Sequence, residues 1–100
     1  STSQAITGDG STSTAIEITN PVTEVNATSA AAPVTLADGA NGQVKTIINV
    51  STSGTSAITI TPSNLRGGTT VTLNAPGETA TLMFKNSNWN VIGGYGFVVA

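Results

Sequence analysis

Apolar and polar residues alternate over short runs along most of the chain. The clearest run spans residues 43–50, where the even-numbered positions share one face of an extended strand and the odd-numbered positions share the other. Residues 57–61 and 79–85 alternate in the same way. Such runs recur about every ten to twelve residues with turn residues between them, which is typical of all-β sandwiches and barrels. No run of useful length has the period of a helix.

The turns between these runs are marked by glycine, proline and asparagine. Pro76-Gly77 and the segment 86–88 are expected to form tight turns. Asp38-Gly39 and Asn41-Gly42 mark a further turn that needs positive φ angles. The chain is therefore predicted to fold as a compact all-β sandwich or barrel of about seven to nine short antiparallel strands.

The N-terminal segment differs from the rest of the chain. Residues 1–13 are rich in Ser, Thr and Gly and hold too little apolar surface to fold alone, so a flexible N-terminal arm is expected. Residues 14–100 are predicted to form a single β domain. Both chain ends have the character of natural ends, so a nearly complete small protein is expected. The side chains predicted to lie in the core or in a subunit interface are Ile48, Ile58, Ile60, Leu82, Phe84, Trp89, Ile92 and Phe97.

Charge narrows the set of functions. Only 8% of the residues are charged, against roughly 25% in typical soluble domains. Three separated cations, Lys45, Arg66 and Lys85, do not form the basic footprint that nucleic acid or an anionic membrane surface requires. Thr, Ser and Asn replace the missing charges, and they protect poorly against self-association. Either this is simply a Thr-rich β domain or, as we favour, copies of the chain or a partner cover much of its surface.

Residues that carry catalysis are scarce. The chain has no His and no Cys, which excludes disulfides, Cys-ligated zinc and a His-activated nucleophile. Its carboxylates are scattered, and most lie beside turns rather than in a catalytic pair. Residues 38–42 offer oxygen ligands for calcium but lack the acids of an EF-hand loop, so a hairpin turn that uses Asp and Asn for positive φ is favoured. We expect no enzymatic activity, no cofactor and no metal.

Trp89 and the segment Arg66-Gly67-Gly68 each allow two interpretations. Trp89 either anchors the core or a subunit interface, which is favoured, or stacks against a sugar together with Tyr95. Arg66-Gly67-Gly68 has the composition of a phosphate-binding loop. Because no strand, loop and helix unit surrounds it, an ordinary turn is favoured there.

The last two thirds of the chain resemble virion proteins of tailed phages. The segment GlyGluThrAlaThrLeuMetPheLysAsnSerAsnTrpAsnValIleGly at 77–93 is similar to the strand, polar turn and Trp-x-Val-Ile strand that close β-rich domains of that class. Segment 36–47 resembles the partner hairpin of the same modules, and segment 59–65 extends the resemblance. The resemblance implies an all-β fold and common trimeric assembly. It does not distinguish tail fibres, spikes and small outer-capsid proteins, and the N-terminal third has no such counterpart.

Chain length favours one member of this class. A fibre would bring shaft repeats or an attachment domain, so the resemblance favours a homotrimeric capsid decoration (cement) protein that stabilises the phage head. It implies a place on the outer capsid surface of the virion after synthesis in the host cytoplasm, with the major capsid protein as partner. The arm residues expected to contact the capsid are Gln4, Ile6 and Asp9. Alternatives are a tail-fibre, spike or baseplate domain that binds host-surface glycan, and a small lectin-like or enzymatic domain outside any virion.

Overall fold

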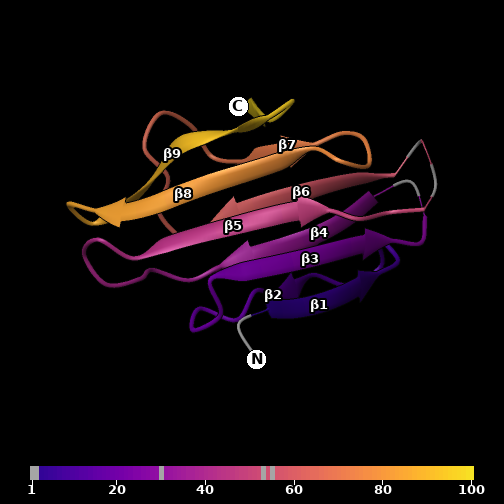
Figure 1. Cartoon of the computed structure of the whole chain (residues 1–100), viewed down its shortest axis with the longest axis horizontal. Coiled ribbons are helices and arrows are strands. Elements are labelled where there is room, and N and C mark those ends of the chain that lie inside the picture. The colour runs from indigo at the N-terminus through magenta and orange to yellow at the C-terminus, as the bar shows by residue number, and fades with distance from the viewer. Residues whose placement is uncertain (1–2, 30, 53, 55) are drawn as a thin grey trace.

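The chain folds as two β-sheets packed face to face. The computed structural model describes residues 3–29, 31–52, 54 and 56–100. These residues form ten strands and no helix, which confirms the all-β prediction, although the number of strands is slightly higher than the seven to nine expected. The sheets have the strand orders β1-β3-β5-β8-β9 and β10-β7-β6-β4-β2, and they form a sandwich rather than a closed barrel (Figure 1). The strands are β1 (Ser3–Gly8), β2 (Thr14–Ala15), β3 (Val22–Ala27), β4 (Ala31–Leu36), β5 (Val44–Asn49), β6 (Ala57–Pro62), β7 (Val71–Leu73), β8 (Thr79–Lys85), β9 (Asn88–Tyr95) and β10 (Val98–Val99).

The first six strands wind back and forth between the sheets. β1, β3 and β5 pair in parallel in the first sheet, and β2, β4 and β6 pair in parallel in the second. Each turn of the chain thus adds one strand to each sheet, which is the principle of a β-solenoid. We call residues 3–62 the parallel coil. The prediction of antiparallel strands is wrong here, because each strand is followed by a strand of the other sheet before the chain returns in the same direction.

The last four strands reverse direction and pair antiparallel. β7 joins β6 and β10 joins β7 in the second sheet, while β8 joins β5 and β9 joins β8 in the first. Asn86 and Ser87 connect β8 to β9 with φ angles of 54° and 66°, the positive values that a two-residue type I′ hairpin requires. Gly77 has a φ of 90°, and the Glu78 N–H donates to the Ala75 carbonyl at 3.2 Å. The tight turns predicted at 76–77 and 86–88 are confirmed.

Part of the expected flexible arm belongs to a sheet. Residues 3–8 form β1, which pairs with β3 from Ser3 opposite Val22 to Gly8 opposite Ala27. Ile6 is buried between the sheets. The expectation of an arm is wrong for these residues, because main-chain pairing with β3 supplies the contacts that their small polar side chains lack. The first two residues of the predicted arm lie outside the described residues.

Apolar side chains fill the space between the sheets, with Trp89 as the largest fully buried one. Its indole N–H donates to the Ala37 carbonyl at 2.9 Å, so the one polar atom of the ring is satisfied. Its ring meets the Phe84 ring edge to face, with centroids 5.3 Å apart. The buried apolar residues are Ile6, Ile16, Val25, Ala27, Ala32, Val34, Leu36, Ile47, Ile58, Ile60, Val71, Leu73, Ala80, Leu82, Phe84 and Trp89.

Buried polar side chains fix the crossing from β5 to β6. The Asn49 amide donates to the carbonyls of Leu73 at 3.1 Å and Ser56 at 3.3 Å, and its oxygen accepts the Ser51 N–H at 3.0 Å. The Ser51 hydroxyl in turn accepts the Ala27 N–H at 2.9 Å. These bonds tie the crossing to both sheets, as buried polar groups must be bonded to be tolerated.

Candidate functional site

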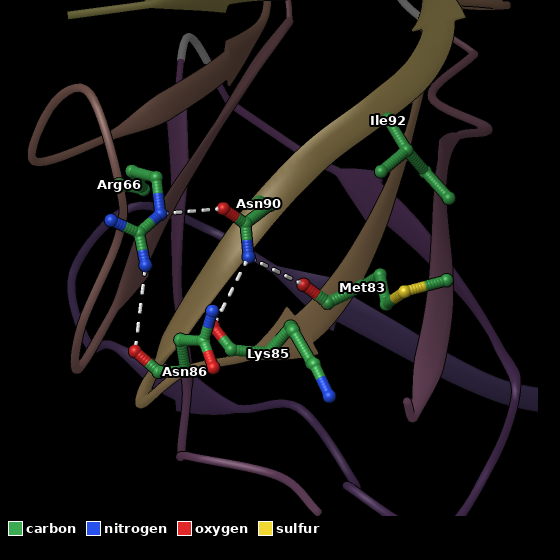
Figure 2. Close-up of a pocket in the computed structure, with 6 residues that line it drawn as sticks. All are labelled: Arg66, Met83, Lys85, Asn86, Asn90 and Ile92. Atoms are coloured by element: carbon green, nitrogen blue, oxygen red, sulfur yellow. Dashed lines mark hydrogen bonds between the residues drawn. The ribbon is translucent and has the colours of Figure 1, made fainter. Parts of the chain in front are cut away.

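The two cations that reach solvent meet at one pocket. Lys45 is fully buried, whereas Arg66 and Lys85 are exposed. Arg66 and Lys85 both line an open pocket of about 350 Å³ (Figure 2). The whole lining consists of Arg66, Met83, Lys85, Asn86, Asn90 and Ile92. All of the exposed side-chain positive charge of this chain is therefore gathered in one place.

The β8–β9 hairpin supplies the floor of the pocket. Met83 and Lys85 occupy outward positions of β8, since Leu82 and Phe84 point into the core. Asn90 lies opposite Met83 on β9. The floor is thus the outer face of the first sheet, close to the tight turn between these two strands.

A β-bulge presents the apolar rim of the pocket. Val91 lies opposite Leu82, but the next pair is Gly93 with Thr81, so Ile92 is the extra residue on β9. The Ile92 side chain is 55% exposed. Together with Met83 it gives the pocket an aliphatic wall on the side away from Arg66 (Figure 2).

Arg66 reaches the pocket because its loop docks on the free edge of β9. The Trp89 N–H donates to the Asn64 carbonyl, and the Arg66 N–H donates to the Trp89 carbonyl, both at 2.9 Å. These bonds form a short parallel bridge between Leu65 and Trp89. The bridge places Arg66 next to Asn90, across β9 from the residues of β8.

The guanidinium of Arg66 is held in place by neutral oxygens. Its Nε donates to the Asn90 side-chain oxygen at 2.8 Å, and Nη2 donates to the Asn86 carbonyl at 3.4 Å (Figure 2). The Asn90 amide nitrogen donates to the carbonyls of Asn88 at 3.1 Å and Met83 at 3.2 Å, which fixes its own orientation. Neither bond of the guanidinium neutralises its charge. The remaining N–H groups of a fixed Arg are well suited to a carboxylate or another oxyanion.

Lys45, the third cation, serves the fold. Its Nζ donates to the carbonyls of Glu17 at 2.8 Å and Asn20, and to the Thr23 hydroxyl at 2.9 Å. Burial lowers the pKa of Lys45, while the negative charge of Glu17 partly opposes this shift. The ammonium thus ties the turn between β2 and β3 to the first sheet from inside.

Most of the predicted core or interface residues lie between the sheets. Ile58, Ile60, Leu82, Phe84 and Trp89 are buried, and Phe97 is partly buried against the core. Two residues do not point inward. Ile48 is half-buried on the outer face of β5, and Ile92 forms the pocket rim described above. For these two, a place in a subunit interface stays a prediction.

Trp89 and Tyr95, the two rings considered for sugar stacking, differ in exposure. Trp89 is fully buried, so its ring cannot reach a sugar in this fold. Tyr95 is 71% exposed near the end of β9. Only Tyr95 is therefore open to a ligand.

The three predicted capsid-contact residues have different surroundings. The Gln4 side-chain oxygen accepts the Glu17 N–H at 2.7 Å, and Ile6 lies in the core. Both side chains are engaged within the fold. Asp9 is exposed, and the Ser11 hydroxyl and N–H both donate to its carboxylate, at 2.6 and 2.9 Å, which lowers the pKa of Asp9.

The described residues hold no group of three or more His, Cys, Asp or Glu side chains arranged to bind a metal ion. In the turn at 38–42, which was considered as a calcium site, both Asp38 carboxylate oxygens accept from the Asn64 amide, at 2.9 and 3.0 Å. Nor do the described ranges contain a helix long and apolar enough to cross a membrane. No protein-family model and no curated protein matches this chain.

The pocket is the feature that sequence reasoning missed. Arg66 and Lys85 are distant in the sequence, which predicts separate charges. In the fold, the bridge between Leu65 and Trp89 brings them together. No local sequence pattern predicts such a bridge between distant segments. The Asn-rich turn beside Lys85 was the available signal, since its Asn86 carbonyl accepts a hydrogen bond from the guanidinium.

Proposed function

We propose that this chain is a virion structural protein, a homotrimeric decoration protein on the outer capsid of a tailed phage. Its role is mechanical: it binds adjacent capsid subunits and holds them together. The resemblance of segments 36–47, 59–65 and 77–93 to phage virion modules supports the class of protein. The proposed role in binding capsid subunits is supported by one observation on the fold, the composition of the outer face of the second sheet.

That outer face has no charged residue among the positions described. The inward positions of β4 and β6 are buried, so the alternate positions face outward. A surface of Ala, Thr, Pro and Val is unusual on a protein exposed to water, where charges normally maintain solubility. Interfaces, in contrast, are depleted of charge at their centres. We call this set the charge-free face: Ala15, Ala31, Pro33, Thr35, Ala57, Thr59, Thr61, Thr72 and Val98.

The first test is the absolute mass of the purified chain by light scattering after size exclusion. A trimer near three times 9.9 kDa is expected. Thr61→Lys places a charge on the charge-free face and is expected to convert the trimer to monomers that keep the native circular dichroism spectrum. Thr7→Lys is the matched control, because Thr7 is an equally exposed strand threonine on the other sheet. A monomeric wild-type chain, or a trimer that tolerates Thr61→Lys, would overturn the assembly proposed here.

The second test concerns the capsid. The wild-type chain is mixed with capsids assembled from the major capsid protein of the same phage, and the mixture is sedimented. Saturable co-sedimentation at a fixed ratio to capsid subunits is expected, because binding at symmetric sites repeats with the lattice. A chain that stays in the supernatant would contradict the decoration role.

The alternative, attachment to host-surface glycan as part of a fibre or baseplate, is favoured by the exposure of Tyr95. An amphipathic ring that is open to solvent can stack on a sugar. This alternative predicts binding of the wild-type chain to a host-glycan array and loss of that binding in Tyr95→Ala. Equal signals from both chains would leave no role for the ring.

A further inference from the structure

The pocket between Arg66 and the β8–β9 hairpin has a chemistry of its own. The net charge of the chain is −2, yet its two exposed cations line this single pocket. An anionic group that approaches this protein is therefore attracted to one place and repelled or ignored elsewhere. Two cations are too few to bind a nucleic-acid backbone, but they are enough for one carboxylate.

The pocket is also organised before a ligand arrives. Asn90 holds Nε of Arg66, and the Asn86 carbonyl holds Nη2, so the orientation of the guanidinium is fixed. Both partners are neutral, and the charge is left for a ligand. A pre-organised guanidinium loses less conformational entropy on binding than a free side chain does.

The opposite wall distinguishes a peptide from a sugar. It consists of the aliphatic side chains of Met83 and Ile92. Proteins commonly bind sugars against an aromatic face, but the nearby Trp89 is fully buried and Tyr95 is not part of the lining. In an extended peptide, side chains two positions apart point to the same side and lie about 7 Å from each other. An acidic residue and an aliphatic residue on the same side of such a peptide have the chemistry of the two walls.

We propose that this pocket binds an Asp or Glu side chain of an extended segment in a partner protein, with an aliphatic residue two positions away packed on Met83 and Ile92. The inference rests on the proposed function, because it names the chemistry that the capsid partner presents. Arg66 binds the carboxylate, Lys85 adds charge, and Asn90 is a positioning residue that orients Arg66.

The test is a nuclear magnetic resonance titration of the ¹⁵N-labelled full chain. The probe is the peptide acetyl-Thr-Glu-Thr-Ile-Thr-amide, and the control peptide carries Gln in place of Glu. We expect saturable shifts of the Arg66 Nε–H and Asn90 side-chain amide signals with the Glu peptide. We expect Arg66→Gln and Lys85→Gln each to weaken binding, the former by about tenfold or more. Glu24→Gln, which changes an acid away from the pocket, should bind as the wild type does.

Three results would overturn the inference. They are an absence of shifts with the Glu peptide, equal binding of the Gln peptide, and tighter binding of glucuronate than of the Glu peptide, which would assign the pocket to an acidic sugar. Failure here is separable from failure of the proposed function. The light-scattering mass and capsid co-sedimentation of Arg66→Gln report on assembly, whereas the titration reports on the pocket alone.

Discussion

Replacing the buried lysine, Lys45→Met, should lower the free energy of unfolding by about 1 to 3 kcal/mol. Methionine has nearly the same length and remains apolar, so the change removes the ammonium while it leaves the core filled. The carbonyls of Glu17 and Asn20 then lose the donor that they share. The Thr23 hydroxyl keeps a partner, because it also donates to the Gln4 side-chain oxygen at 3.1 Å.

The magnitude follows from the two carbonyls. A buried acceptor left without a donor costs about 1 to 3 kcal/mol. The bonds to the Glu17 and Asn20 carbonyls are only partly buried, so water replaces part of the lost donor and the two carbonyls together cost about 1 to 4 kcal/mol. Removing the ammonium also removes the cost of burying its charge, which offsets part of that loss. The remaining effect, about 1 to 3 kcal/mol, is a measurable part of the roughly 5 to 15 kcal/mol by which small domains are stable.

The assay is urea denaturation followed by Trp89 fluorescence, because that ring is fully buried and becomes exposed on unfolding. Lys85→Met is the matched control: it removes the same charge from an exposed position, and a change within about 0.5 kcal/mol is expected. If Lys45→Met also stayed within about 0.5 kcal/mol of the wild type, the reasoning would be refuted, since the ammonium would then contribute nothing to the fold.

Three further predictions concern single groups. Trp89→Phe should destabilise the fold by about 2 to 4 kcal/mol in thermal unfolding by circular dichroism, through the lost bond to Ala37 and the smaller ring; an unchanged midpoint would contradict this. The pKa of Lys45 is lowered from its ordinary 10.5, so the unfolded chain binds the lysine proton more tightly than the folded chain does. The cost of burying the charged ammonium therefore disappears as the pH rises from the lowered pKa to 10.5. The stability of the wild type relative to Lys45→Met should therefore increase in that window, and a flat difference would argue against a perturbed lysine. Ser11→Ala should raise the pKa of Asp9 toward 3.8 in a carbon-13 titration, since the hydroxyl bond stabilises the carboxylate, and an unmoved pKa would show that this bond is absent in solution.

The sequence was most informative where a turn joins two strands directly. The alternation over 79–85 and the polar residues at 86–88 predicted the hairpin that the structure contains. All the information for such a hairpin is local, because the turn residues set the backbone angles and the alternation sets the inward face.

The parallel coil was not predictable by the same reasoning. Its turns carry strands from one sheet to the other, and the residues that favour such a crossing are the same Gly and Asn that favour a hairpin. The Asp38-Gly39 and Asn41-Gly42 pairs illustrate this. The hairpin expected there is wrong, because these residues join β4 of the second sheet to β5 of the first. Stacked positions do not recur at a constant interval either: Gln4 lies beside Thr23, whereas Val22 lies beside Thr46. A repeat of variable length leaves no fixed period in the sequence.

The inward face of β5 shows why part of the interior was also not predictable from the sequence. Both faces of this strand carry apolar residues, and the inward one also carries Lys45 and Asn49. Polarity would place these two side chains in solvent. They are buried because carbonyls from distant parts of the chain accept their hydrogen bonds, among them those of Glu17 and Leu73. Such partners are set by the tertiary fold and are invisible in a local pattern.

The positions of the chain ends determine how this protein carries mechanical load. The N-terminus leads into β1 at one margin of the sandwich, and the C-terminus lies at the opposite margin (Figure 1). A force between the two ends pulls across the strands, so the ladder from β1 to β3 opens one hydrogen bond at a time. A force along the strands must instead break a whole ladder at once. The sandwich therefore resists a force along its strands better than a force between its ends, and a cargo fused to either end would load the weaker of these two directions.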